Sequence, residues 1–128
     1  MRVTAINFAP LPLRKTLEAY FHSLNGHLNV VRVLLDRGSE PNKQAERGNT
    51  ALHYAALRGH REVVRLLLDK GSNSDLANEN GMTALHIAIS NCHEGVFKLL
   101  MERGADTNKM NNSGETPDQL WLRLTYGI

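Results

Sequence analysis

The chain has 128 residues, of which 41% are hydrophobic and 22% are charged, and its 15 basic and 13 acidic residues leave a net charge of +2. This near balance excludes the strongly basic field that is typical of proteins binding nucleic acid or anionic membranes. Cys92 is the one cysteine, so an internal disulfide is excluded and the sequence predicts a reducing compartment, the cytoplasm or the nucleus.

Residues 1–14 form a distinct N-terminal segment. Its apolar stretch from Ala5 to Leu13 is short and broken by Pro10 and Pro12, so it lacks the form of a secretory signal. No run in the chain approaches the roughly 20 apolar residues of a membrane-spanning helix, and we expect no membrane contact. The segment is either a cap over the first folded unit or a disordered tail. The apolar side chains available for a cap are Val3, Ile6, Phe8, Leu11 and Leu13.

A 33-residue repeat dominates the rest of the chain. Gly48, Gly81 and Gly114 are spaced by 33 residues, and the first two open nearly identical segments, Gly-x-Thr-Ala-Leu-His-x-Ala. A fixed period of this length indicates one supersecondary unit stacked on copies of itself, since a single unit cannot bury its own apolar face. The predicted units are at about residues 15–45, 46–78 and 79–111, with a partial unit at 112–122 and a tail at 123–128.

Each unit is predicted to contain two helices and a hairpin-like loop. Thr50 and Thr83 are placed as helix N-caps, because a hydroxyl accepts a bond from an otherwise unpaired N–H of the first turn. The first helix is expected to end near Gly59, and the second, with apolar residues at helical spacing, before Gly71. The polar segment from Gly71 to Gly81 has the composition of turns.

From about Thr16 to about Leu122 the chain resembles the ankyrin repeat family, on the basis of this motif and its period. The resemblance implies an all-α solenoid of stacked helix-turn-helix units with β-hairpin-like loops, in about three to four repeats with degenerate ends. The first unit lacks the motif, reading Lys15 to Tyr20 in its place, while the last has Asp118 where leucine is expected. A capping helix, a partner site and a cut array all remain open for the C-terminal end. Its apolar residues, expected to be exposed, are Leu120, Trp121, Leu122 and Leu124.

The histidines are interpreted as architecture. His53 and His86 occupy equivalent positions, and the resemblance implies that each ties the start of its helix to the adjoining loop by hydrogen bonds. No zinc-ligand spacing, hydrolase motif or phosphate-binding loop is present in the sequence, so we expect no metal, no cofactor and no catalytic activity. Cys92 replaces the glycine found at Gly26 and Gly59, and is predicted to end a helix at a cost in backbone strain.

Recognition is expected where the repeats differ. In the family, partners contact the loop tips and the adjoining face of the first helices, so the resemblance implies a non-catalytic protein-binding module acting as an adaptor, scaffold or inhibitor. The mixed polarity of the residues at these positions favours a protein partner over a phosphate backbone. We also expect the chain to be a monomer. Two alternatives remain: these positions are merely solvated, or the chain is a spacer in a longer array. The corresponding residues are Glu46, Arg47, Asn49, Leu57, Arg58, Glu79, Asn80, Met82, Ser90, Asn91, Asn112, Ser113 and Glu115.

The resemblance also implies a modification. Ankyrin proteins are substrates of an asparagine hydroxylase that acts on the asparagine closing the polar run, with a leucine eight residues before it and an acidic residue two before it. Asn42, after Leu34 and Glu40, fits this pattern, and Asn108 fits it through Leu100 and Asp106. The equivalent position in the middle unit holds an aspartate.

Overall fold

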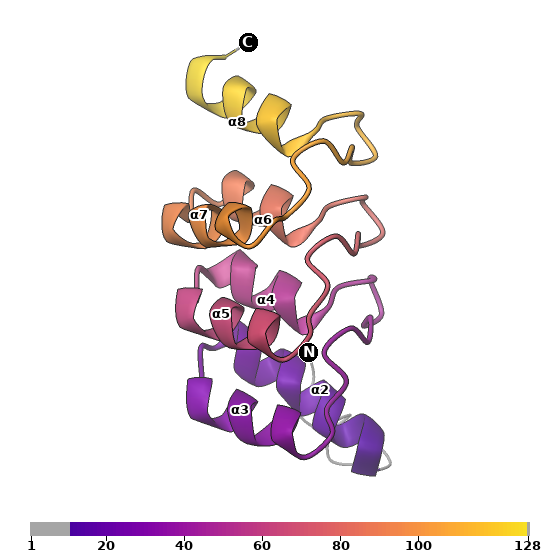
Figure 1. Ribbon diagram of the computed structural model, residues 1–128. Helices are drawn as coiled ribbons and strands as arrows, with labels where there is room; N and C mark the ends of the chain where they lie inside the picture. Colours follow the sequence, from indigo (N-terminus) through magenta and orange to yellow (C-terminus); the bar gives the residue numbers. More distant parts are fainter. Residues whose placement is uncertain (1–10, 128) are drawn as a thin grey trace.

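The computed structural model describes residues 11–127 as two layers of stacked helices (Figure 1). Helices α2, α4, α6 and α8 lie over one another in the first layer, and α3, α5 and α7 form the second. The long loops all project to the same side. No strand occurs within residues 11–127, and the predicted all-α solenoid is confirmed. The helices are α2 (Leu11–Leu24), α3 (Leu28–Asp36), α4 (Ala51–Arg58), α5 (Arg61–Asp69), α6 (Ala84–Ser90), α7 (Glu94–Glu102) and α8 (Pro117–Tyr126).

Helix α4 begins and ends where the sequence predicts. The Thr50 hydroxyl accepts the backbone N–H of His53, while His53 Nδ1 accepts the backbone N–H of Thr50 at 2.9 Å. This reciprocal capping box satisfies two donors that the first turn leaves unpaired. Thr83 caps α6 in the same way. Gly59 ends α4 with a φ of 74°, in the left-handed region that glycine adopts without steric cost.

Each long loop turns back on itself at its outer end. In the middle loop, the backbone N–H of Asn78 donates to the carbonyl of Met82 at 3.0 Å, and that of Gly81 donates to Asn78 at 2.9 Å. The first loop repeats the pattern between Ala45 and Asn49. These turns are hairpin-like, as predicted. We call them the fingers and define them as residues 45–49, 78–82 and 111–115.

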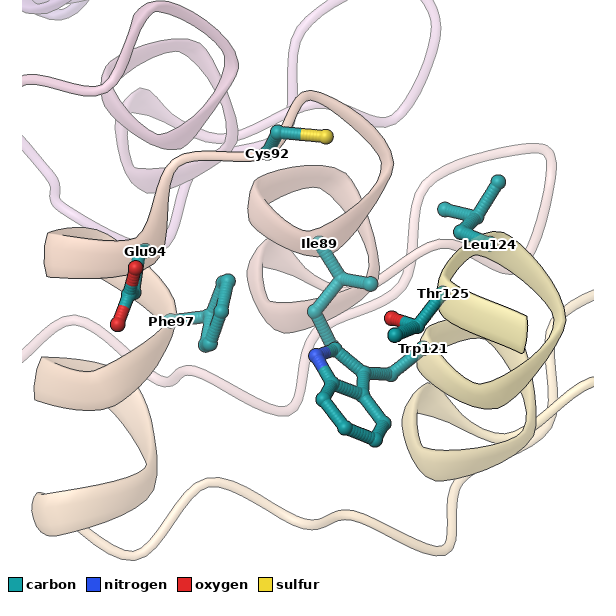
Figure 2. Close-up of a pocket in the computed structure, with 7 residues that line it drawn as sticks. All are labelled: Ile89, Cys92, Glu94, Phe97, Trp121, Leu124 and Thr125. Carbon is teal, nitrogen blue, oxygen red and sulfur yellow. The ribbon is translucent and has the colours of Figure 1, made fainter.

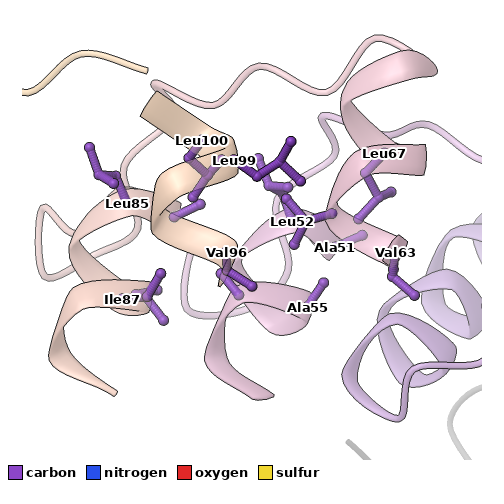
Figure 3. Close-up of a cluster of buried hydrophobic side chains, with 14 of the residues drawn as sticks. Ala51, Leu52, Ala55, Val63, Leu67, Leu85, Ile87, Val96, Leu99 and Leu100 are labelled. Atoms are coloured by element: carbon purple, nitrogen blue, oxygen red, sulfur yellow. The ribbon is translucent and has the colours of Figure 1, made fainter. Parts of the chain in front are cut away.

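The core lies between the helices of successive units (Figure 3). Ala55 and Ala88 of the first layer are fully buried, and their small side chains allow close approach of neighbouring helices. Leu67, Leu85 and Leu100 are also fully buried and fill the space between units. Burying one leucine side chain stabilises a fold by roughly 1.5–3 kcal/mol. Because the cluster is shared by all units, the stack has one core.

The first unit replaces the missing motif with different contacts. Tyr20 stands where His53 and His86 stand in later units, and its hydroxyl donates to the carbonyl of Lys43 at 2.6 Å. Ser39 Oγ donates to the carbonyl of Lys15 at 2.9 Å and joins α2 to the loop after α3. Helix α2 begins at Leu11, so its first turn lies within the segment expected as an extension. Residues 1–10, including three of the apolar residues named for a cap, are outside the described part of the chain.

The last unit has an altered first helix. Helix α8 continues to Tyr126, so its last turn lies in the segment expected as a tail. The expectation that Leu120 is exposed is wrong: this side chain is 3% exposed, because α8 packs on α6 and Leu120 joins the shared core. Trp121, Leu122 and Leu124 are exposed, as predicted.

Cys92 has a φ of 58°, and no other non-glycine residue within 11–127 has a positive φ. At the equivalent Gly59, a Cβ would lie 2.6 Å from Nδ1 of His93, so sterics as well as backbone conformation require glycine there. The residue equivalent to His93 in the last unit is Tyr126, which lies in the last turn of α8 and does not begin a second helix. The steric requirement is thus absent at Cys92, and only the backbone strain remains.

We therefore expect Cys92→Gly to stabilise the protein. Relief of about 1–2 kcal/mol of left-handed strain, less roughly 0.5–1 kcal/mol for the greater chain entropy of glycine, predicts a gain of about 0.5–1 kcal/mol. Urea unfolding followed by circular dichroism measures it. Cys92→Ala is the control, because it keeps the strain and should change little. A loss of stability in Cys92→Gly relative to Cys92→Ala would contradict this account.

Candidate protein-binding surface

His53 joins α4 to the next finger. It is 2% exposed, its Nδ1 accepts the Thr50 backbone N–H, and its Nε2 donates to the carbonyl of Met82 at 2.9 Å. Because Nδ1 is an acceptor, the ring is neutral with its proton on Nε2. Burial lowers the pKa of His53, and a proton on Nδ1 would also face the Thr50 donor. This histidine is a structural tie, as the sequence interpretation held.

His86 makes the same contacts one unit later. Its Nδ1 accepts the backbone N–H of Thr83 at 3.2 Å, and its Nε2 donates to the carbonyl of Glu115 at 3.0 Å. Burial lowers the pKa of His86. In α8 the equivalent residue is Gln119, whose Oε1 accepts the backbone N–H of Thr116 at 2.9 Å. No cluster of three or more metal-ligating side chains is present in residues 11–127.

The three fingers are joined tip to tip. The backbone N–H of Glu79 donates to the carbonyl of Arg47 at 3.1 Å, and that of Asn112 donates to Asn80 at 3.0 Å. Asn112 Nδ2 also donates to the carbonyl of Glu79 at 2.7 Å. Gln44 Nε2 donates to the carbonyl of Ala77 at 3.0 Å and so joins the bases of the first and second fingers. These bonds hold neighbouring tips at a fixed separation.

Asn49 and Met82 link neighbouring fingers with their side chains. Asn78 Nδ2 donates to Asn49 Oδ1 at 2.9 Å, and Asn111 Nδ2 lies 3.4 Å from Met82 Sδ. Both predicted recognition residues are half-buried. Asn49 and Met82 therefore help to hold neighbouring fingers together, and as half-buried residues they are also partly accessible at the surface.

Glu115 is held by a residue that the sequence analysis missed. Arg123 of α8 donates to its carboxylate from Nε at 2.6 Å and from Nη2 at 3.1 Å, which lowers the pKa of Glu115. Eight residues separate the pair, a spacing that no helical rule singles out.

Tyr54 was also missed; it is half-buried in α4, and burial raises its pKa. Its equivalents, Ile87 and Leu120, are different residues, and that variation is the signal that points to Tyr54.

The other ten predicted recognition residues are exposed at two levels of the surface. The finger tips carry Glu46, Arg47, Glu79, Asn80, Asn112 and Ser113. The last turns of α4 and α6, with the residue that follows α6, carry Leu57, Arg58, Ser90 and Asn91. The structure thus arranges them as two rows on the first-layer helices and their fingers. Each row changes in charge or size from unit to unit, except that the equivalent residues Glu46 and Glu79 are identical.

A scan against models of protein families matches residues 19–111 to the family described as ankyrin repeats (3 copies). This match covers well over half of the chain. The chain belongs to the ankyrin repeat family. Ankyrin repeats are generally protein–protein interaction modules and are typically non-catalytic. A search of curated proteins found no match.

The two asparagines named for hydroxylation occupy different environments in the ankyrin stack. Asn42 bridges to the next loop, where its Oδ1 accepts the backbone N–H of Asn73 at 2.6 Å and its Nδ2 donates to the carbonyl of Gly71 at 3.0 Å. Asn108 is exposed, and within residues 11–127 no side-chain hydrogen bond of its amide is present. Among the helices of the same residues, none has the length and apolar character needed to cross a membrane.

Proposed function

We propose that this ankyrin domain is a non-catalytic adaptor, scaffold or inhibitor that binds a protein partner through its finger tips and the adjoining ends of α4 and α6. The observation that carries the proposal is the contrast between fixed support and variable surface. The histidines that repeat at the period are buried in ties such as His53–Met82, whereas most positions of the exposed rows change from unit to unit. The free thiol of Cys92 is compatible with the cytoplasm or nucleus as the compartment.

Rigidity supports this role. The fingers are cross-linked by backbone bonds from Glu79 to Arg47 and from Asn112 to Asn80. The second and third fingers are also anchored to α4 and α6 through the buried histidines His53 and His86. A surface that is already ordered loses little conformational entropy when it binds, so its contacts are converted into affinity more fully. Exposed groups of both signs, such as Arg58 and Glu79, fit a protein surface of mixed polarity.

We expect the triple variant Arg47→Ser, Arg58→Ser, Asn80→Ala to lose its partner. Removal of two cations and one amide from a recognition patch costs on the order of 2 kcal/mol or more, a loss of at least about thirtyfold in affinity. Partner capture followed by titration of the recovered protein measures it. The control is Arg32→Ser with Arg65→Ser, which removes the same charge from the second-layer helices. Equal loss in both variants, or a lowered melting temperature in the triple variant, would contradict the assignment.

The spacer alternative makes a different prediction. A self-sufficient module sediments as a monomer and melts in one cooperative transition, whereas a unit cut from a longer array associates through its exposed ends. Trp121, Leu122 and Leu124 are exposed apolar side chains through which such association could occur. Analytical ultracentrifugation over a hundredfold concentration range separates the two. Self-association that Leu124→Ser abolishes would favour the spacer.

We further propose Asn108 as the preferred hydroxylation site, ahead of Asn42. The enzyme must draw the side chain into its own active site, and for Asn42 this breaks two inter-loop hydrogen bonds. Each hydrogen bond makes a net contribution of about 0.5–1.5 kcal/mol. Asn108 is therefore expected to react roughly tenfold faster than Asn42, or more. Peptide mass spectrometry of protein from oxygenated and hypoxic cells measures the gain of one oxygen atom at each residue. Equal occupancy, or modification at Asn42 alone, would contradict the preference.

A further inference from the structure

A hollow lies between α7 and α8 at the last unit of the stack, lined by apolar side chains together with the charged residues Glu94, Lys98 and Asp118 (Figure 2). It consists of two adjoining spaces of about 380 Å³ and 200 Å³ that share Ile89, Glu94, Phe97 and Trp121. In Figure 2 the Trp121 indole extends from α8 towards Ile89 and Phe97. Met101 lines the larger space. We call this hollow, lined by Ile89, Phe97, Met101 and Trp121, the α7–α8 groove.

The repeat shows what normally fills such a position. The residues equivalent to Phe97 are Val31 and Val64, both fully buried, whereas Phe97 is only half-buried. In those units a second-layer helix follows, α5 packing on α3 and α7 packing on α5. Within residues 11–127, α8 has no second-layer helix beside it (Figure 1). The groove is therefore the place that the next second-layer helix would occupy.

Comparison of equivalent residues also indicates which face of an occupying helix would contact the groove. Val33, Leu66 and Leu99 are equivalent, and their exposed fractions are 47%, 7% and 1%. Within residues 11–127, only Val33, in α3, has no preceding second-layer helix. This position therefore faces the preceding unit, and a helix in the groove must present a leucine or valine there.

Ion pairs between successive units indicate which charge the occupying helix should carry at its C-terminal end. Lys70 pairs with Asp36 at 2.7 Å, and Arg103 pairs with Asp69 at 2.8 Å, each across one unit boundary. Glu102 is the next acidic residue in this series. Within residues 11–127 it interacts electrostatically with Lys98 but forms no ion pair across a unit boundary. Lys70 and Arg103 are the C-cap residues of α5 and α7, so a lysine or arginine at the C-cap of the occupying helix would complete the series at Glu102.

Geometry favours a lone helix from another molecule. A second copy would bring a first-layer helix together with its second-layer helix, and the first-layer place above α6 is already taken by α8. Helix α8 itself runs two residues past Leu124, which is equivalent to the end of α4 at Arg58. Thr125 and Tyr126, equivalent to Gly59 and His60, remain helical, and the left-handed glycine that ends α8 is Gly127, two residues later than its place in the repeat.

We propose that the α7–α8 groove binds a single amphipathic helix of a partner protein, docked where the next second-layer helix would lie. The helix places leucine or valine against Phe97 and Trp121, and a lysine or arginine at its C-cap beside Glu102. This site shares no residue with the surface proposed above, so either proposal can fail without the other.

The chain supplies both the reporter and the probe for a test. Trp121 is its only tryptophan and lines the groove, so its fluorescence reports occupancy directly. The probe is a synthetic peptide with the sequence of residues 60–71, which contains α5 and Lys70. Short isolated helices are marginal in water, so the peptide is held helical by a cross-link between positions 61 and 65. A matched peptide with Leu66→Ser is the control.

Binding should shift Trp121 emission to shorter wavelength with saturation at one peptide per chain, and the Leu66→Ser peptide should bind at least about tenfold more weakly. Glu102→Lys should weaken the original peptide by about three- to tenfold, and a Lys70→Glu peptide should restore binding to that variant. Circular dichroism confirms that Glu102→Lys is folded. An absent shift, equal binding of both peptides, or a failed charge exchange would overturn the proposal. A concentration-dependent shift without peptide, accompanied by dimers in sedimentation, would overturn it in favour of a second copy.

Discussion

Leu85→Ala is expected to lower the free energy of unfolding by about 2–5 kcal/mol, the range for truncating a fully buried leucine that leaves a cavity behind. Leu85 is 0% exposed in α6, which packs on both α4 and α8, so the cavity opens at the centre of the stack. The stability of a repeat protein depends on interfaces between neighbours, and this loss weakens two of them. Urea unfolding followed by circular dichroism measures the change. Total stabilities are about 5–15 kcal/mol, so the effect is large.

Leu57→Ala is the matched control, since Leu57 is 39% exposed in the neighbouring first-layer helix α4. Its loss should stay within about 0.5 kcal/mol, as for ordinary surface substitutions. Should the Leu85 variant be too unstable to purify, Leu85→Val is expected to show a smaller loss in the same direction. Equal effects at Leu85 and Leu57 would contradict a core shared between units.

Acidification is expected to destabilise the protein through His53 and His86. Burial lowers the pKa of both rings in the folded state, so the unfolded chain binds their protons more readily. Their contribution is fully present above the unfolded value of about 6.5 and is lost as the pH falls through that value towards the folded pKa. Each unit of pKa difference corresponds to about 1.4 kcal/mol per histidine. Urea midpoints at a series of pH values from about 7.5 to about 5 measure the loss.

The double variant His53→Gln, His86→Gln separates these rings from other groups. Gln119 already accepts the backbone N–H of Thr116 in α8, so glutamine can preserve the cap while it removes the titrating ring. We expect some loss of stability at neutral pH, where the bonds to Met82 and Glu115 are broken, and a flatter pH dependence. His22, whose pKa burial also lowers, is unchanged in both proteins and so cancels in the comparison. An unchanged slope in the double variant would exclude the two rings as the cause.

Much of the fold follows from local chemistry that a sequence displays. The threonine caps at Thr50 and Thr83 and the glycine end at Gly59 depend on residues within one or two turns of each other, and the structure confirms them. The equivalence of Cys92 with Gly59 indicated backbone strain if its φ were positive, and the structure has a φ of 58° there. The recognition residues were chosen by a different rule, their failure to repeat, and their binding role remains a proposal.

Contacts between distant parts of the chain were not predictable in this way. Leu120 is buried only because α8 packs on α6. Arg123 bonds to Glu115 at a separation of eight residues, beyond the three- or four-residue spacing of ordinary helical pairs. Tyr20 replaces a histidine by reaching a carbonyl 23 residues away. These outcomes depend on where other helices lie, which no local propensity encodes.

The sequence by itself determined the repeated unit, its helix ends and the family, because those features depend on periodicity and on bonds between near neighbours. Only the tertiary structure decided which residues the stack leaves uncovered. Phe97 and Val64 have equivalent places in the repeat, yet Val64 is fully buried and Phe97 lines an open groove. The physical reason is that a stacked unit is buried by its neighbours, so the exposure of a residue depends on whether the next helix is present.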